Sequence, residues 1–330
     1  MNAKNVMKLS IIVPCYNEQE ALPYYFKAME ALRPQLPLEF EYIFVNDGSR
    51  DQTLVLLRTL ATEHASVHYL SFSRNFGKEA ALYAGLQRAT GDYVTVMDAD
   101  LQDPPSMLLE MYAKIQDPEI DCVGTRRIDR VGEPKLRSFF ARLFYRLMNK
   151  FGQMPMMDGE RDFRLMTRPV VDAILSMKEY NRFSKGLFSW VGFNTVYLPY
   201  ENQKRVAGTT SWSFWRLFSY SLEGIVNFSD APLNMASFVG ASSCLLAVIA
   251  LIIIIIRTLV FGDATAGWPS LVSIFLFIGG LQLLSLGIIG KYIGKIFLET
   301  KKRPPYLIKE NEQTYLEKHA TTAGSQTETH

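Results

Sequence analysis

Two acidic residues with the spacing of a metal site stand in the first third of the chain. Asp98 and Asp100 follow a short apolar run, with only Ala99 between them, and Gln102 comes two positions later. In an extended segment, side chains two positions apart point the same way. Carboxylate and amide oxygens suit a hard cation that also binds a diphosphate. We therefore predict a Mg²⁺ or Mn²⁺ site here, completed only when a diphosphate arrives.

Polar side chains also follow three earlier apolar runs. These residues are Asn17 and Glu18 after the first run, Asn46, Asp47, Ser49 and Asp51 after the second, and Arg74, Asn75 and Lys78 after the third. Any one of them could serve a turn or a helix cap, and for Ser49 and Asp51 that is the simpler interpretation. Polar groups after four successive runs instead favour a shared binding site.

The elements that would position these groups alternate between strand and helix. We expect strands at 9–13, 42–45, 67–72 and 93–97, and helices at 18–33, 53–63 and 79–88. Such a series predicts an α/β domain with a parallel sheet. Ligands of such sheets bind at the carboxyl ends of the strands, where the polar groups stand.

Two long uncharged segments follow the α/β part. Neither 231–256 nor 264–290 contains a charged residue, and each exceeds the roughly 20 apolar residues that cross a bilayer. Buried core helices are the alternative. Lysines and arginines gather after the second segment, from Lys291 to Arg303, whereas the connector has none beyond the bordering Arg257. This distribution predicts that both termini and the α/β domain are cytoplasmic.

Two further segments combine aromatic residues with a position beside the apolar part. Basic and aromatic residues alternate at helical spacing in 137–150, which predicts a helix in the membrane interface, and 211–228 is rich in tryptophan and phenylalanine. An amphipathic helix packed on the sheet is the alternative for 137–150. The expected organisation is a catalytic domain at 1–210, a juxtamembrane helix at 211–230, two transmembrane helices at 231–300 and a disordered tail at 301–330. The net charge of +2 and the lack of a basic stripe argue against nucleic acid.

Five motifs carry a resemblance to a known family. They are SIIVPCYNE (10–18), NDGSRD (46–51), SRNFGKEAAL (73–82), MDADLQDPP (97–105) and RDFRLM (161–166). Together they resemble glycosyltransferase family 2, and within it the branch that acts on polyprenyl phosphates. The resemblance implies a Rossmann-like, nucleotide-sugar-binding domain of the glycosyltransferase A type, with interfacial helices and two C-terminal transmembrane helices.

The same resemblance implies roles for individual residues. Asp100 and Gln102 match metal ligands, Asp98, Asp162 and Arg205 match catalytic positions, and the nucleotide-sugar site would comprise Pro14, Tyr16, Glu18, Asp47, Lys78 and Asp98. We predict contacts with the acceptor phosphate at Arg126, Arg137, Arg142 and Arg205. The pattern departs from the family at Asn46, where many relatives have Asp, and at Ser211, where Lys is common. Asp162 is either a base or an orienting residue.

The activity implied is inverting transfer of a hexose from a nucleotide diphosphate sugar to undecaprenyl phosphate. The donor would be UDP-glucose or a related UDP-sugar. The resemblance further implies an enzyme of the cytoplasmic membrane and a homo-oligomer, by likeness a tetramer. A processive polysaccharide synthase is the first alternative, but the chain has no Q-x-x-R-W string. A non-catalytic scaffold or flippase partner is the second, and the intact Asp98, Asp100 and Gln102 argue against it.

Overall fold

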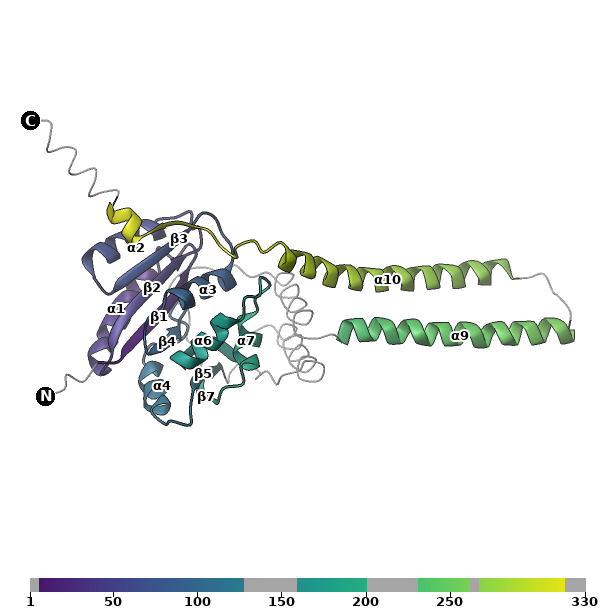
Figure 1. Cartoon of the computed structure of the whole chain (residues 1–330), viewed down its shortest axis with the longest axis horizontal. Helices are drawn as coiled ribbons and strands as arrows, with labels where there is room; N and C mark the ends of the chain where they lie inside the picture. The colour runs from purple at the N-terminus through teal and green to yellow at the C-terminus, as the bar shows by residue number, and fades with distance from the viewer. Residues whose placement is uncertain (1–5, 128–158, 201–230, 262–266, 318–330) are drawn as a thin grey trace, which may run out of the picture.

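A computed structural model describes residues 6–127, 159–200, 231–261 and 267–317 of the chain (Figure 1). Its first part alternates strand and helix as the sequence predicts. The elements are β1 (Lys8–Cys15), α1 (Leu22–Leu32), β2 (Glu39–Asn46), α2 (Thr53–Glu63), β3 (Val67–Phe72), α3 (Lys78–Arg88) and β4 (Tyr93–Val96). The four predicted strands and the three predicted helices are therefore confirmed, with small shifts at their ends.

All strands in the described ranges belong to one sheet of eight, in the order β7-β5-β6-β4-β1-β2-β3-β8. The four strands predicted from sequence pair in parallel, β4 with β1, β1 with β2 and β2 with β3. Beyond them the sheet is mixed, because β6 runs antiparallel to both β4 and β5, and β8 runs antiparallel to β3. The added strands are β5 (Cys122–Arg127), β6 (Glu160–Thr167), β7 (Thr195–Tyr200) and β8 (Ile308–Asn311).

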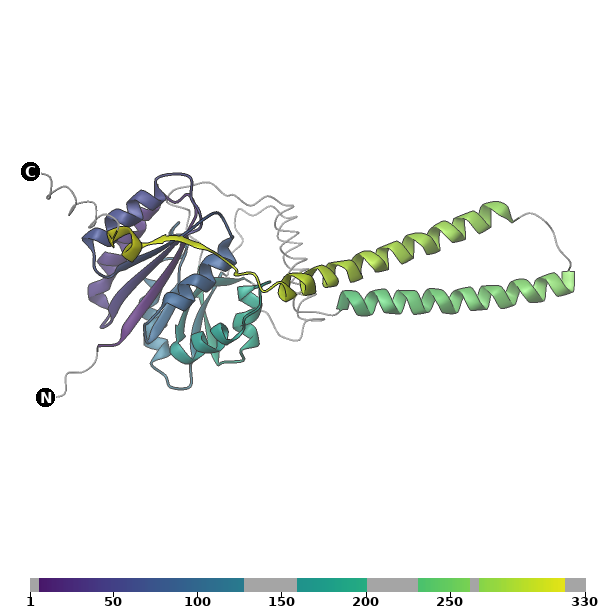
Figure 2. The same ribbon diagram turned by 45° about the horizontal axis from the view of Figure 1, so that its top comes forward.

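Helices cover both faces of this sheet, as the two views in Figures 1 and 2 show. One core cluster joins a sheet face to α1, α2 and α4 (Met107–Ile115), and centres on large side chains such as Tyr25 and Phe44. The other joins the opposite face to α3, α6 (Arg168–Ser176) and α7 (Ser184–Trp190). Strands buried on both faces read as continuous apolar runs, which is why the sequence identifies the central ones.

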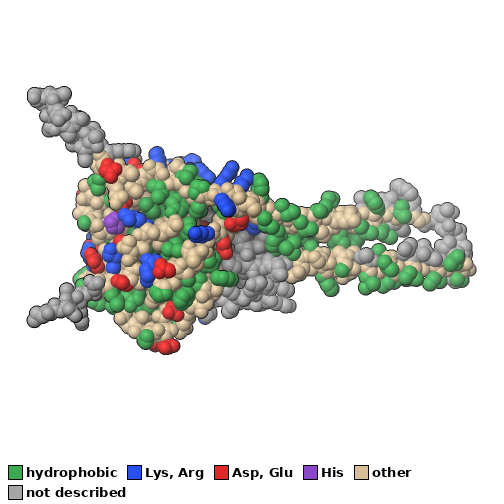
Figure 3. Space-filling view, in the orientation of Figure 1, with side chains coloured by type: hydrophobic (Ala, Val, Ile, Leu, Met, Phe, Trp, Pro, Cys, Tyr) green, Lys and Arg blue, Asp and Glu red, His purple; other side chains and the backbone are tan. Residues whose placement is uncertain are grey.

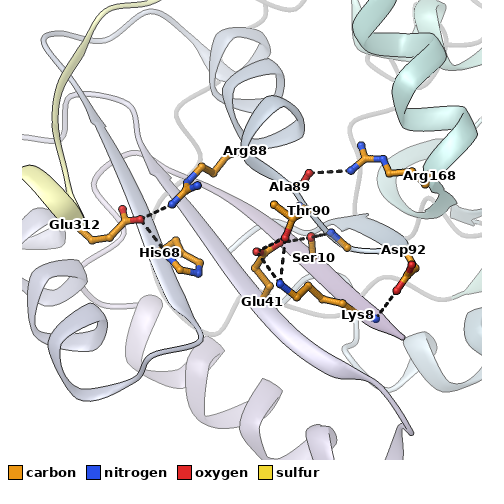
Figure 4. Close-up of polar contacts among 11 residues, drawn as sticks. Lys8, Ser10, Glu41, His68, Arg88, Ala89, Thr90, Asp92, Arg168 and Glu312 are labelled. Carbon is orange, nitrogen blue, oxygen red and sulfur yellow. Dashed lines mark hydrogen bonds and ion pairs between the residues drawn. The ribbon is translucent and has the colours of Figure 1, made fainter. Parts of the chain in front are cut away.

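A buried carboxylate fastens the amino ends of the central strands, opposite to the rim that carries the predicted site. Glu41 of β2 accepts hydrogen bonds from Ser10 Oγ of β1 and from the backbone and hydroxyl of Thr90, and Lys8 Nζ lies 3.5 Å away (Figure 4). Burial alone would raise the pKa of Glu41, but these hydrogen bonds lower it. The network therefore keeps a charged group satisfied in the core.

Two long helices, α9 (Ala231–Phe261) and α10 (Trp268–Thr300), extend together from the α/β part (Figures 1 and 2). Each contains a stretch apolar enough to cross a membrane, Leu233–Ala250 and Phe277–Thr300. No described side chain in these stretches is buried within the chain, and Figure 3 shows apolar side chains along both helices. The alternative of buried core helices therefore does not fit.

The segment after α10 differs from the expected disorder. It returns to the sheet, and β8 pairs with the edge strand β3 before a short helical stretch over 312–317 (Figure 2). The prediction of a disordered tail was therefore wrong for 308–317, because polar side chains of this segment bind charged partners that are distant in sequence. The predicted helices at 137–150 and 211–228 lie outside the described residues.

Candidate active site

The carboxyl ends of the four parallel strands meet at one edge of the sheet. Cys15 at the end of β1 is in register with Asn46 of β2, and Asn46 is in register with Ser71 of β3. The loops that leave these strands therefore start side by side. The amide of Asn46 also donates a hydrogen bond of 2.9 Å to the hydroxyl of Ser71. Asn46, which stands where many relatives have Asp, therefore uses its amide to link β2 to β3.

Two of the polar residues beyond β2 connect its loop to the loop beyond β1. Ser49 Oγ accepts a hydrogen bond from the Asn17 backbone at 3.0 Å, and Asp51 accepts bonds from the backbones of Gln19 and Thr53. Asp51 therefore forms a local turn with Thr53, as the simpler interpretation proposed, but α2 has Gln52 as its N-cap without a side-chain hydrogen bond, so neither Ser49 nor Asp51 caps this helix. Pro14, Tyr16 and Glu18, predicted to line the nucleotide, belong to β1 and the same loop, and Tyr16 is exposed.

Asp47 fixes the loop that follows β3. Its two carboxylate oxygens accept hydrogen bonds from the backbones of Phe76 at 2.6 Å and Gly77 at 2.9 Å. Gly48 makes this close approach possible, since a Cβ there would lie 2.4 Å from the carbonyl carbon of Arg74. Burial raises the pKa of Asp47, and the backbone hydrogen bonds counteract part of that rise. Each carboxylate oxygen can accept a second bond, so Asp47 can still receive one from a ligand.

Lys78 is held between two of the predicted acidic residues. Its Nζ lies 2.7 Å from an oxygen of Asp98 and 2.7 Å from an oxygen of Asp162. Lys78 opens α3, and a cation at a helix N-terminus is unfavourable for the helix itself. Burial alone would lower the pKa of Lys78, but the charges of Asp162 and Asp98 raise it. Lys78 thus lies between two carboxylates at a position where a cation is unfavourable for the helix. Such conflicts between local preference and structure are expected at functional sites.

Asp162 pairs with Lys78 and not with Arg164, its neighbour two positions later. Burial would raise the pKa of Asp162, but the charges of Lys78 and Lys185 lower it below the usual range. Arg164 instead pairs with Glu160 at 2.7 Å inside the domain and stacks on Phe188. The residues that form this buried pair support β6 rather than the rim.

The turn that carries Asp98, Asp100 and Gln102 differs from the extended geometry assumed above. β4 ends at Val96, and Asp100 Oδ1 accepts a hydrogen bond of 3.1 Å from the Gln102 backbone. Leu101 between them has φ of 56°, a left-handed conformation that is unusual for a bulky residue. Such outliers persist where surrounding structure imposes them, commonly at binding sites. In the described part of the chain, no three His, Cys, Asp or Glu side chains gather as a metal-ligand set.

A cluster beside this turn was missed by the sequence analysis. Asp103 is buried, accepts a hydrogen bond from the Tyr200 hydroxyl, and lies 3.3 Å from Arg161 Nε. Burial raises the pKa of Asp103, and the charge of Arg161 counteracts part of that rise. These contacts fasten the turn to β6 and β7. The only sequence signal was the position of Asp103 beside Gln102 and of Arg161 beside Asp162.

The predicted acceptor contacts are described only in part. Arg126 belongs to β5 and is in register with Glu160 of β6. Arg137, Arg142 and Arg205 lie outside the described residues, so the structure does not place them. The structure brings together Lys78, Asp98 and Asp162, with Asp100 and Gln102 on the turn that Asp98 begins.

The sequence has relatives along nearly its whole length. It matches glycosyl transferase family 2 over residues 10–175. It is 44% identical to the putative glycosyltransferase CsbB of Bacillus subtilis over 92% of this chain and 91% of that protein. It is 42% identical to the bactoprenol glucosyl transferase of Shigella phage SfV over 93% of this chain and all of that protein.

A solved structure gives a weaker likeness. The mannosyltransferase PcManGT from Pyrobaculum calidifontis, in complex with GDP-Man and Mn²⁺, is 15% identical over 88% of each chain, with a TM-score of 0.46. That degree of similarity transfers no ligand to this chain. The family match covers half of the chain, and the two relatives extend over both the α/β domain and the segments beyond it, so together they decide its membership. This chain belongs to glycosyl transferase family 2.

Proposed function

We propose that this enzyme transfers glucose from UDP-glucose to undecaprenyl phosphate, with inversion at the anomeric carbon. The observation that carries the proposal is the rim where Lys78 lies between Asp98 and Asp162, in a chain that also has two long apolar helices. Relatives named bactoprenol glucosyl transferase share its length and support a lipid acceptor. A site that binds a diphosphate sugar in water and a lipid at a membrane accounts for both parts of the chain.

A divalent cation, Mg²⁺ or Mn²⁺, fits the chemistry of the turn after β4. Asp100 and the side-chain oxygen of Gln102 would hold it, and Mg²⁺ commonly combines one or two carboxylates with substrate phosphates. The left-handed Leu101 between these two residues supports a specialised turn. When bound, the cation would neutralise negative charge on the diphosphate.

In the proposed reaction, an oxygen of the acceptor phosphate attacks the anomeric carbon of glucose. The bond from that carbon to the UDP oxygen breaks, and its electron pair leaves with UDP. The acceptor is already an anion at neutral pH, so it needs no base to remove a proton. The lowered pKa of Asp162 makes this residue a weak base. We therefore propose that Asp162 holds Lys78 in place, and that the ammonium of Lys78 stabilises the negative charge of the donor.

The acceptor is proposed to approach from the bilayer, past Arg126, Arg137, Arg142 and Arg205. Aromatic and basic residues in 137–150 suit the surface of an anionic membrane. Replacing Arg137 and Arg142 together by Gln should raise the KM for undecaprenyl phosphate several-fold and leave the KM for UDP-glucose nearly unchanged. Steady-state kinetics in mixed micelles measure both. A rise for UDP-glucose alone would contradict this acceptor path.

Both termini and the catalytic domain are proposed to face the cytoplasm. Transfer of radiolabelled glucose from UDP-glucose to lipid should then occur in sealed inside-out vesicles and be absent in sealed right-side-out vesicles, because UDP-glucose does not cross the bilayer. Detergent should restore activity to the second preparation. Labelled lipid in neither preparation, with undecaprenyl phosphate supplied, would contradict the proposed function. Other nucleotide sugars in the same assay test the choice of glucose.

We also propose that the chain forms a homo-oligomer in the membrane. Gly279, Gly280 and Gly287 give α10 small faces on which helices can approach closely. The mass of the detergent-solubilised protein tests this. A monomer at micromolar concentration would contradict it.

A further inference from the structure

The tail after α10 is fastened along the edge strand β3 by charged side chains. Glu310 lies 2.6 Å from Arg58 Nη2 and accepts a hydrogen bond from the Tyr69 hydroxyl. Glu312 accepts from Arg88 and contacts His68 (Figure 4). Burial alone would raise the pKa of Glu312, but the hydrogen bonds with His68 and Arg88 lower it to about 2. The tail is therefore attached through two carboxylates, the buried Glu312 and the partly buried Glu310, and each has charged partners.

The start of the tail is held where α10 ends. Glu299, in the last turn of α10, accepts hydrogen bonds from the backbones of Tyr180 and Asn181, each at 3.0 Å. Pro304 and Pro305 then restrict the backbone before the tail reaches the sheet. The second apolar helix is thus joined to the edge of the sheet by a short segment held at both ends.

Tyr306 is the residue of this segment that packs against the end of β3 and against α3. Its ring stacks on Phe72 at 4.8 Å between centroids, and its hydroxyl donates to Gln87. Phe72 in turn packs edge-on against Phe76 at 5.8 Å. The next residue, Leu307, accepts a backbone hydrogen bond of 2.9 Å from Ser73. The segment therefore touches the loop after β3 both at its first residue and, through Phe72, at Phe76.

This loop, residues 73–77, is the one that Asp47 holds through Phe76 and Gly77. Arg74 of the loop lies over the Phe76 ring at 4.0 Å. A shift of Phe76 would therefore move a cation of the rim and the backbone that binds Asp47. Stacked aromatic rings have a preferred geometry and resist such a shift.

We infer that Tyr306 is a positioning residue for the donor nucleotide, acting through Phe72 and Phe76 on the loop 73–77 and on Asp47. The inference rests on the proposed function, in which this rim binds UDP-glucose. It gives the segment after the second apolar helix a part in donor binding, although Tyr306 itself touches no substrate in this scheme. Loss of its ring should weaken the donor site and spare the acceptor site.

The test compares three variants of the full-length enzyme in detergent. Tyr306→Ala should raise the KM for UDP-glucose and the Kd for UDP about tenfold, with the KM for undecaprenyl phosphate and kcat nearly unchanged. Tyr306→Phe keeps the stacked ring and should behave as the wild type. Tyr315→Ala is the matched control, because Tyr315 lies in the same tail but packs on Arg58, away from the loop. Tyr315→Ala should leave the KM for UDP-glucose and the Kd for UDP unchanged.

Thermal unfolding separates this role from a merely structural one. Equal losses of kcat in Tyr306→Ala and Tyr315→Ala, together with equal falls in Tm, would overturn the inference, as would an unchanged KM for UDP-glucose in Tyr306→Ala. If Tyr306→Ala does not fold, Tyr306→Leu serves in its place, with the same expected rise in the donor KM. A wild-type enzyme that neither binds UDP nor forms labelled lipid would instead contradict the proposed function.

Discussion

Replacing Asp100 by Asn is expected to lower kcat about a thousandfold and to eliminate binding of Mn²⁺ in the presence of UDP. A metal ion stabilises transition-state charge by several kcal/mol, and each 1.4 kcal/mol corresponds to about a factor of ten. Asn preserves the shape of Asp100 and can still accept the hydrogen bond from the Gln102 backbone, so the turn should remain folded. Enzyme assays and electron paramagnetic resonance of free Mn²⁺ measure the two effects separately.

Asp117 offers a matched control for this substitution. Its Oδ1 accepts a hydrogen bond of 3.0 Å from the Glu119 backbone two residues later, as Asp100 does from Gln102, but it follows α4 and is exposed. Asp117→Asn should leave kcat and Mn²⁺ binding unchanged. Wild-type activity in the Asp100→Asn variant, or in the wild type with excess EDTA, would contradict the metal assignment.

The central half of the sheet could be predicted because its strands carry their own signal. Each is a short run of apolar residues, buried on both faces and followed by turn chemistry, as in β2 from Glu39 to Asn46. The polar residues after these runs could be assigned to one rim by topology alone. The two apolar helices could also be predicted, since their uncharged segments are longer than those of helices in a soluble core.

The remaining elements depend on contacts that a local pattern does not show. β6 contains Arg164, which is buried only because Glu160 and Phe188 surround it. β8 is four residues of mostly polar sequence; its Glu310 pairs with Arg58, and Glu312, just after the strand, pairs with Arg88, both far away in the chain. From sequence alone, a short polar segment without local periodicity is predicted to be disordered. For the same reason the sequence could not show that Lys78 lies between two carboxylates.

Replacing Lys78 by Met should lower kcat by about a hundredfold to a thousandfold, the usual cost of removing a preorganised electrostatic contact. Met has a similar length and no charge, so Asp98 and Asp162 lose the cation that lies 2.7 Å from each. The two carboxylates would then add negative charge beside a negatively charged donor. The KM for UDP-glucose should rise as well, and steady-state kinetics measure both constants.

The pKa of Asp162 gives a separate, pH-dependent test of its role. In the wild type this pKa lies below its usual value of about 4, so Asp162 stays ionised above that pH and its ion pair with Lys78 is lost only at more acidic pH. Burial raises the pKa of Asp162, and without Lys78 fewer positive charges counteract this effect, so the pKa of Asp162 should rise. If Asp162 acts only by holding Lys78, this rise should not limit Lys78→Met, and the acidic limb of its kcat/KM profile should not move to higher pH. A limb that moves up with the pKa of Asp162 would show that ionised Asp162 is needed in its own right.

Two comparisons decide whether Asp162 acts through Lys78 or as a base. Lys8 has nearly the same exposed fraction as Lys78, 35% against 34%, and pairs with Glu41 at the opposite edge of the sheet, so Lys8→Met controls for loss of a lysine charge. If Asp162 serves to hold Lys78, Asp162→Asn should retain more activity than Lys78→Met, because Asp98 still binds the ammonium. The double variant should then be no worse than Lys78→Met, since residues in contact are not additive. An inactive Asp162→Asn enzyme beside a largely active Lys78→Met enzyme would instead make Asp162 the base, and would show that the acceptor phosphate must lose a proton before it attacks.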